Sequence, residues 1–116
     1  MKAMKVGIAT REEIQKRTID IAAGRLKPKA SDPKIWFTSI RSASALLSEE
    51  NRALLKTIDK EQPDSVVELA ELTGRKQSNL SRTLNTMSKY GFVELRKLDR
   101  KVKPIAKTTK FLIEAA

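Results

Sequence analysis

The feature that most constrains the fold is the pattern of residues 65–95. Apolar side chains recur there at helical spacing in two stretches, first over residues 66–72 and then over residues 80–90. Gly74 follows the first stretch, where a sharp turn favours a residue without a side chain, and Gly91 ends the second. The pattern therefore predicts two helices that cross closely and are joined by a short turn.

A basic, extended segment follows the second of these helices. Residues 92–98 alternate apolar and polar side chains with a period of two, which predicts a strand. Residues 99–101 are polar and typical of a turn, and an extended pattern resumes over residues 102–106. Pro104 favours an edge strand, because proline has no backbone N–H to donate to a neighbour. We therefore expect a β-hairpin at this point of the chain.

The N-terminal part of the chain predicts one strand and one helix. Residues 4–9 alternate loosely and are typical of a short strand. Thr10 is the expected N-cap of a helix that runs toward Gly24, because acidic residues follow in its first turn and favour the helix dipole. Residues 25–34 contain two prolines and many polar groups, which indicates a linker or an extended connection.

The middle and the end of the chain are less distinct. Residues 35–37, with the sequence IWF, form either a brief strand or the lead-in to a helix. Residues 40–47 carry apolar side chains at helical spacing. Ser48 is the expected cap of a further helix, which Pro63 ends. Residues 109–114 hold an apolar patch that is too short to assign.

The positive charge of the chain is concentrated in one segment. The 116 residues carry a net charge of +10, and residues 74–110 alone hold 11 basic and 2 acidic side chains. Residues 31–73 are instead acidic on balance. The excess of positive charge indicates an anionic partner, either nucleic acid or a membrane surface. A solvated surface would spread its lysines more evenly, so the concentration in one segment is typical of a binding footprint.

The composition argues against catalysis and against a metal site. The chain contains no cysteine and no histidine, which excludes thiol nucleophiles, disulfides, the commonest general base and the commonest metal ligand. It also lacks a nucleophile–base pair and a glycine-rich phosphate loop. We therefore expect a protein that is not an enzyme and that uses no cofactor. No apolar run approaches the ~20 residues of a membrane span, and the first ten residues do not read as a signal peptide, so we expect a cytoplasmic protein.

Two segments carry a resemblance to a known family. Residues 35–58 (IWFTSIRSASALLSEENRALLKTI) and 62–95 (QPDSVVELAELTGRKQSNLSRTLNTMSKYGFVEL) resemble the winged helix-turn-helix transcriptional regulators of the MarR/ArsR-like superfamily. More narrowly, they resemble small prokaryotic regulators, some of which occur as antitoxins beside a toxin gene. The resemblance implies an α+β fold, mainly α with a small β-hairpin. Lys76 departs from the pattern, since many relatives place Ser, Asn or Asp there as a helix cap; here the cap either comes from Ser78 or is absent.

In this fold the second helix of the motif enters the DNA major groove with its N-terminal half facing the bases. Arg82 can donate two hydrogen bonds to guanine, the side-chain amides of this helix can pair with adenine, and its short hydroxyls suit phosphate or base contacts. Arg75, Lys76 and Lys89 are interpreted as phosphate contacts. The amides belong to Gln77, Asn79 and Asn85, and the hydroxyls to Ser78 and Ser81.

The hairpin would form the wing. Its tip, Arg100 and Lys101, together with the nearby Arg96, is expected to reach the flanking DNA backbone or the minor groove. Lys97 and Lys103 lie close by in the sequence. With the residues of the preceding helix, these complete the predicted DNA-binding surface.

The predicted organisation has three parts. Residues 1–34 form a strand–helix extension for dimerisation or partner binding, residues 35–108 form the winged helix-turn-helix domain, and residues 109–116 form a C-terminal tail. A homodimer would read two half-sites about one helical turn (~34 Å) apart on the DNA. Trp36 and Phe37 pack either under the dimer interface or in the core of the winged domain.

The function expected from these observations is a sequence-specific regulator that binds double-stranded DNA and represses its own operon. The alternative is an antitoxin that neutralises a partner toxin through its terminal segments while repressing its operon. A toxin-like gene next door would separate the two. A sequence-neutral single-strand binder is less favoured, because the chain has only five aromatic residues for base stacking.

Overall fold

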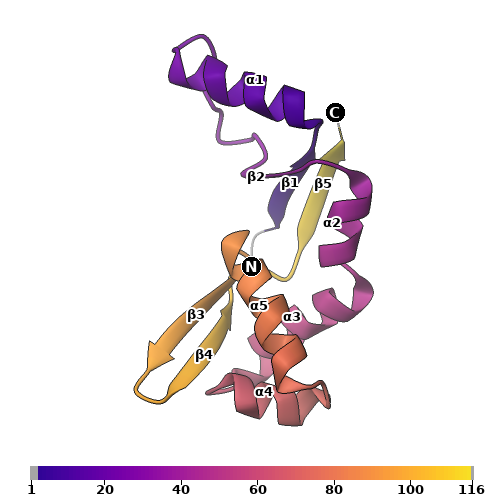
Figure 1. The fold of residues 1–116 in the computed structure, drawn as a ribbon, viewed down its shortest axis with the longest axis vertical. Coiled ribbons are helices and arrows are strands. Elements are labelled where there is room, and N and C mark those ends of the chain that lie inside the picture. Colours follow the sequence, from indigo (N-terminus) through magenta and orange to yellow (C-terminus); the bar gives the residue numbers. More distant parts are fainter. Residues whose placement is uncertain (1–2, 116) are drawn as a thin grey trace. The chain divides into compact units, whose positions relative to one another are not determined.

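The computed structural model describes residues 3–115 as two compact units that mix helices and strands (Figure 1). The helical unit comprises residues 47–109, and the sheet unit comprises residues 3–46 together with residues 110–115. This division differs from the expected boundaries at 34 and 108. Residues 35–37 pair with residues 6–8, so this segment belongs with the N-terminal strand and not with the helices that follow it.

The helical unit contains three helices followed by a hairpin, in the order that the sequence predicts. Its elements are α3 (Glu49–Glu61), α4 (Val66–Thr73), α5 (Gln77–Lys89), β3 (Val93–Leu98) and β4 (Lys101–Ala106).

Local signals account for the ends of these helices. The Ser48 hydroxyl accepts a hydrogen bond from the third amide of α3, and Ser65 does the same for α4, so both serines are N-caps. Gly74 ends α4 with φ 72°, a left-handed conformation that costs glycine little. Gln62 holds φ 46° at the end of α3, just before the buried Pro63.

One apolar core joins the helices to the hairpin. Within this unit, α4 packs on α5, β3 on α5, and β4 on α3 and α4. Each fully buried side chain removes enough apolar surface from water to contribute about 1.5–3 kcal/mol. The largest buried apolar side chains are Leu55, Ile58, Leu69, Leu80, Leu84, Met87 and Phe92.

The hairpin is a regular antiparallel pair. Val93 lies opposite Ala106, and Leu98 lies opposite Lys101 across a two-residue turn in which Asp99 has φ 43°. Opposite residues share a face, so Leu95 and Pro104 lie on one side of the ribbon while Arg96 and Lys103 lie on the other. Because β4 has β3 as its only strand neighbour among residues 3–115, Pro104 lies in an edge strand, as expected.

The sheet unit contains an entirely parallel sheet with the strand order β2-β1-β5. Its elements are β1 (Met4–Ile8), α1 (Arg11–Ala22), β2 (Ile35–Phe37), α2 (Ile40–Leu46) and β5 (Phe111–Ala115). Strand β5 was not assigned from the sequence, because β1, its strand partner within residues 3–115, lies at the other end of the chain.

Helix α1 is well capped but buries little. The Thr10 hydroxyl accepts from the Glu13 amide, while the Glu13 carboxylate accepts from the Thr10 amide, which completes a capping box. No side chain of the helix is buried, and Ile19 is 59% exposed. Local hydrogen bonds therefore define the start of this helix, while packing against the rest of the unit contributes little.

The two aromatic residues of β2 belong to the sheet unit. Phe37 is 2% exposed, and the Trp36 ring lies so close over Gly7 of β1 that an added Cβ there would sit 2.5 Å from two ring carbons. The Arg17 guanidinium lies 5.4 Å from the Trp36 ring centroid. The interpretation that placed these aromatics in the core of the winged domain is therefore wrong. The lead-in to a helix is likewise excluded, because residues 35–37 form a strand.

Candidate nucleic-acid interface

Helix α5 has two opposite faces. Leu80, Leu84 and Met87 have no exposed surface and attach the helix to the core. At about 100° per residue, the exposed residues at positions 78, 82, 85 and 89 fall in a narrow stripe on the opposite side. We call Ser78, Arg82, Asn85 and Lys89 the α5 stripe.

The stripe combines two basic side chains with a hydroxyl and a side-chain amide, and it contains no acidic residue. Acidic residues are absent from the whole helix, including its first turn. This differs from α1, α3 and α4, each of which has a glutamate in the first turn. The α5 stripe is therefore suited to an anionic partner with directional polar groups.

The N-terminus of α5 lacks the side-chain cap that the other long helices have. Lys76 occupies the N-cap position with φ −65° and ψ 138°, and its side chain makes no cap hydrogen bond. Of the two alternatives that the sequence left open, the absent cap is correct. The first amides of α5 and the positive end of its dipole are thus available to an anion beside the stripe.

Arg75 is engaged within the helical unit. Its guanidinium donates to the Asn79 side-chain oxygen at 2.8 and 3.2 Å and to the Asn51 side-chain oxygen at 3.5 Å. Arg75 is also half-buried. These bonds fix Arg75 and orient Asn79, so the structure gives both residues a positioning role at the start of α5.

The basic side chains of the hairpin divide into paired and unpaired groups. Glu94 forms ion pairs with Arg96 at 2.7 Å and with Lys107 at 3.7 Å, and Asp64 pairs with Lys103 at 3.3 Å. The exposed side chains of Lys97, Arg100 and Lys101 make no ion pair within residues 3–115. The free positive charge of the hairpin is therefore concentrated toward its tip.

A groove of about 360 Å³ lies between α5 and the hairpin. Ser81, Asn85 and Ser88 line it from α5, and Lys97 lines it from β3. Ser88 was not among the predicted contact residues, whereas Lys97 was expected near the wing tip. The period-two alternation of β3 is the sequence feature that indicates the direction of Lys97, because it places Lys97 on the same face of the strand as Leu95.

The structure thus places the predicted residues in different parts of this surface. Ser78, Arg82, Asn85 and Lys89 form the stripe, and Ser81 lies on its hairpin side. Lys76, Gln77, Asn79 and Arg75 surround the start of α5, with Gln77 about 100° away from the stripe around the helix axis. Arg100 and Lys101 are exposed at the hairpin tip, and Arg96 points to the opposite face from Lys97 and is paired.

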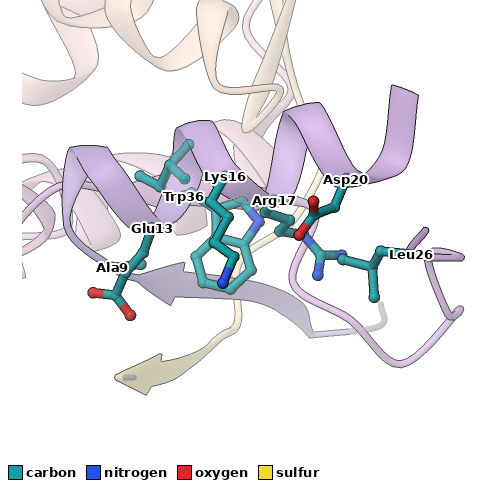
Figure 2. Close-up of a pocket in the computed structure, with 8 residues that line it drawn as sticks. Ala9, Glu13, Lys16, Arg17, Asp20, Leu26 and Trp36 are labelled. Carbon is teal, nitrogen blue, oxygen red and sulfur yellow. The ribbon is translucent and has the colours of Figure 1, made fainter. Parts of the chain in front are cut away.

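The sheet unit has a separate hollow of about 360 Å³ beside α1 (Figure 2). Figure 2 shows Glu13, Lys16, Arg17 and Asp20 on one side of the helix, with Trp36 alongside. The backbone amide and the hydroxyl of Thr10 hold the pKa of Glu13 below its usual value. This hollow carries two acidic and two basic side chains, so it is less suited to a polyanion than α5.

The described residues present neither a metal site nor a membrane-spanning helix. Within residues 3–115, no three acidic side chains converge as cation ligands. None of the described helices has the length and apolar character needed to cross a bilayer.

Comparison with known proteins places the chain in a family. No curated protein and no solved structure matches it significantly. The family model described as HVO_A0114 matches residues 46–113, which is more than half of the chain and includes the whole helical unit. The chain therefore belongs to the HVO_A0114 family.

Proposed function

We propose that this protein is a sequence-specific regulator of transcription that binds double-stranded DNA. In this proposal the helical unit is a winged helix-turn-helix, α4 and α5 form the helix-turn-helix, and the β3–β4 hairpin is the wing. The order of three helices and a basic hairpin supports this assignment. The resemblance to MarR/ArsR-like regulators points to the same fold.

The observation that carries the proposal is the α5 stripe opposite the buried face of α5. A helix that enters the major groove must be held from one side and must present polar groups on the other. Buried Leu80, Leu84 and Met87 hold α5 from one side, and the α5 stripe presents polar groups on the other. A merely solvated helix surface would be expected to mix acids with bases, whereas α5 contains no acid.

Each part of this surface has a distinct proposed role. Arg82 reads guanine through two parallel hydrogen bonds, and Asn85 reads adenine. Ser78 and Lys89, at the two ends of the stripe, contact phosphates. A phosphate also binds at the uncapped start of α5, where Lys76 adds a positive charge.

The hairpin tip contributes affinity in this proposal, while α5 contributes sequence preference. Arg100 and Lys101 neutralise phosphates beside the major-groove contact and release counterions, so their effect depends on salt and not on base sequence. Arg96 contributes less because Glu94 already neutralises it.

The test is a fluorescence-anisotropy titration of the full chain with the DNA upstream of its own gene and with a scrambled duplex, at several salt concentrations. We expect a preference for the upstream DNA that survives moderate salt. Equal binding to both duplexes, lost together as salt rises, would overturn sequence-specific recognition.

Three variants assign the roles within this assay. Arg82→Ala should weaken binding to the preferred DNA by about 1–3 kcal/mol and reduce discrimination at one base pair. Lys101→Ala should weaken binding to both duplexes and lower the salt slope by about 1. Lys56→Ala is the matched control, because it removes an exposed lysine from the middle of α3, outside the proposed surface.

A further inference from the structure

Strand β5 is the least protected strand of the sheet unit. It lies at one edge of the parallel sheet, beside β1 (Figure 1). Leu112 is 57% exposed and Ile113 is 56% exposed, although successive side chains of a strand point to opposite faces. Both faces of β5 are therefore open to solvent at apolar residues.

This exposure is unusual for a strand of this type. Parallel sheets are normally covered on both faces, and their strands are rich in buried aliphatic side chains. Edge strands are normally shortened, charged or covered, because their unpaired backbone groups recruit other strands. β5 has a central apolar sequence, with Lys110 just before it and Glu114 near its end.

We propose that β5 is the dimerisation strand, and that its occupant is the β5 strand of a second copy of this chain. The two strands pair antiparallel about a two-fold axis at Leu112. Two three-stranded sheets then become one continuous six-stranded sheet. The surface is self-complementary, so no other protein is needed to cover it.

Backbone geometry limits the possible registers. The Met4 amide donates to the Lys110 carbonyl, so the backbone groups of residues 110, 112 and 114 face β1. Those of Ile113 and Ala115 consequently face the open edge. A symmetric pair must therefore match odd-numbered residues with odd-numbered residues to form its hydrogen bonds.

Charge selects one register among these. With Leu112 opposite the partner's Leu112, Lys110 lies opposite the partner's Glu114, and Glu114 lies opposite the partner's Lys110. Shifting the axis to residue 111 or 113 removes both opposite-charge pairs. In the selected register, Ile113 lies opposite the partner's Phe111, an aromatic and β-branched pairing that is favourable across strands.

The first test measures the dimer dissociation constant of the full chain by sedimentation equilibrium, with circular dichroism to verify folding. We expect a dimer that K110E or E114K weakens about tenfold, because each substitution turns two attractive pairs into two repulsive ones. The double variant K110E/E114K restores opposite-charge pairs and should restore the wild-type constant.

The second test uses the absence of cysteine from the natural chain. Leu112→Cys places two thiols opposite each other in a non-hydrogen-bonded pair, where Cα atoms lie about 4.5 Å apart and a disulfide forms readily. Ile113→Cys is the matched control, because its thiols would be diagonal neighbours about 7–8 Å apart. We expect mild oxidation to cross-link the first variant and not the second.

A monomeric wild-type chain would overturn the proposal, as would a dimer whose dissociation constant is unaffected by either charge reversal. The register and its charge pairing would be overturned if K110E/E114K did not restore the wild-type dissociation constant. Cross-linking through position 113 in preference to 112 would overturn the register as well. None of these measurements involves DNA, so they separate this inference from the proposed function.

Discussion

A single substitution at Lys76 should move stability and DNA affinity in opposite directions. In α1, α3 and α4 the N-cap hydroxyl accepts from the third helical amide at 3.0–3.2 Å, whereas Lys76 makes no such bond. Its φ of −65° and ψ of 138° already resemble those of Ser48, at −61° and 162°. Lys76→Asp therefore requires little change of the backbone to cap α5.

The magnitudes follow from capping and from Coulomb's law. Relative to Lys76→Ala, which also loses the lysine charge, Lys76→Asp should raise the free energy of unfolding by about 1 kcal/mol. A carboxylate about 4 Å from a bound phosphate repels it by about 4 kcal/mol at an effective dielectric constant of about 20, and less after screening by salt. DNA binding by Lys76→Asp should therefore be at least about tenfold weaker than that of Lys76→Ala.

Urea unfolding followed by circular dichroism measures the first quantity, and anisotropy measures the second. Lys76→Asn serves as the neutral cap, because it makes the same hydrogen bond without the negative charge. If Lys76→Asp binds DNA as tightly as Lys76→Ala, the start of α5 does not hold a phosphate. If neither cap variant is more stable than Lys76→Ala, the capping argument fails.

Three further predictions concern the two units separately. Gly7→Ala should destabilise the sheet unit by about 1–3 kcal/mol, because the new Cβ overlaps the ring of the single tryptophan, whose fluorescence reports the unfolding; unchanged stability would contradict this packing. Leu84→Ala should lower the free energy of unfolding of the helical unit by about 2–5 kcal/mol in urea titrations followed by circular dichroism, and a loss below about 1 kcal/mol would show that the core closes around the cavity. The backbone amide of Lys29 and the guanidinium of Arg17 lower the pKa of Asp32, so its contribution to stability is present above the ordinary aspartate pKa and is lost as the pH falls through the lowered value. Asp32→Asn should therefore reduce the loss of tryptophan-monitored stability between about pH 7 and about pH 3, and an unaltered pH profile would refute this assignment.

Much of the helical unit could be predicted because its signals are local. Ser48, Gly74 and the apolar spacing of α5 each act within a few residues, and the structure has the expected helices at these places. The hairpin also followed from local alternation and a short polar turn. The α5 stripe could be anticipated for the same reason, since the helical period alone places Arg82 and Asn85 on one side.

The candidate site was less predictable where side chains meet across the fold. Arg75 looked like a phosphate contact, but it bonds Asn79 and Asn51, which belong to two different helices. The positive charge of Arg96 is likewise neutralised by Glu94, and that of Lys103 by Asp64. Formal charge along the sequence therefore overstated the free charge of the hairpin.

The sequence by itself determined the helices, the Thr10 and Ser48 caps, the hairpin and the segment in which positive charge gathers, because each depends on residues close together in the chain. Only the tertiary structure decided that residues 35–37 and 111–115 are strands beside β1, and that residues 35–46 belong to the sheet unit. A parallel strand has no hydrogen-bond partner within its own segment, so a short apolar run such as FLI carries no local mark of its pairing. The partner strand, distant in sequence and adjacent in space, supplies that information.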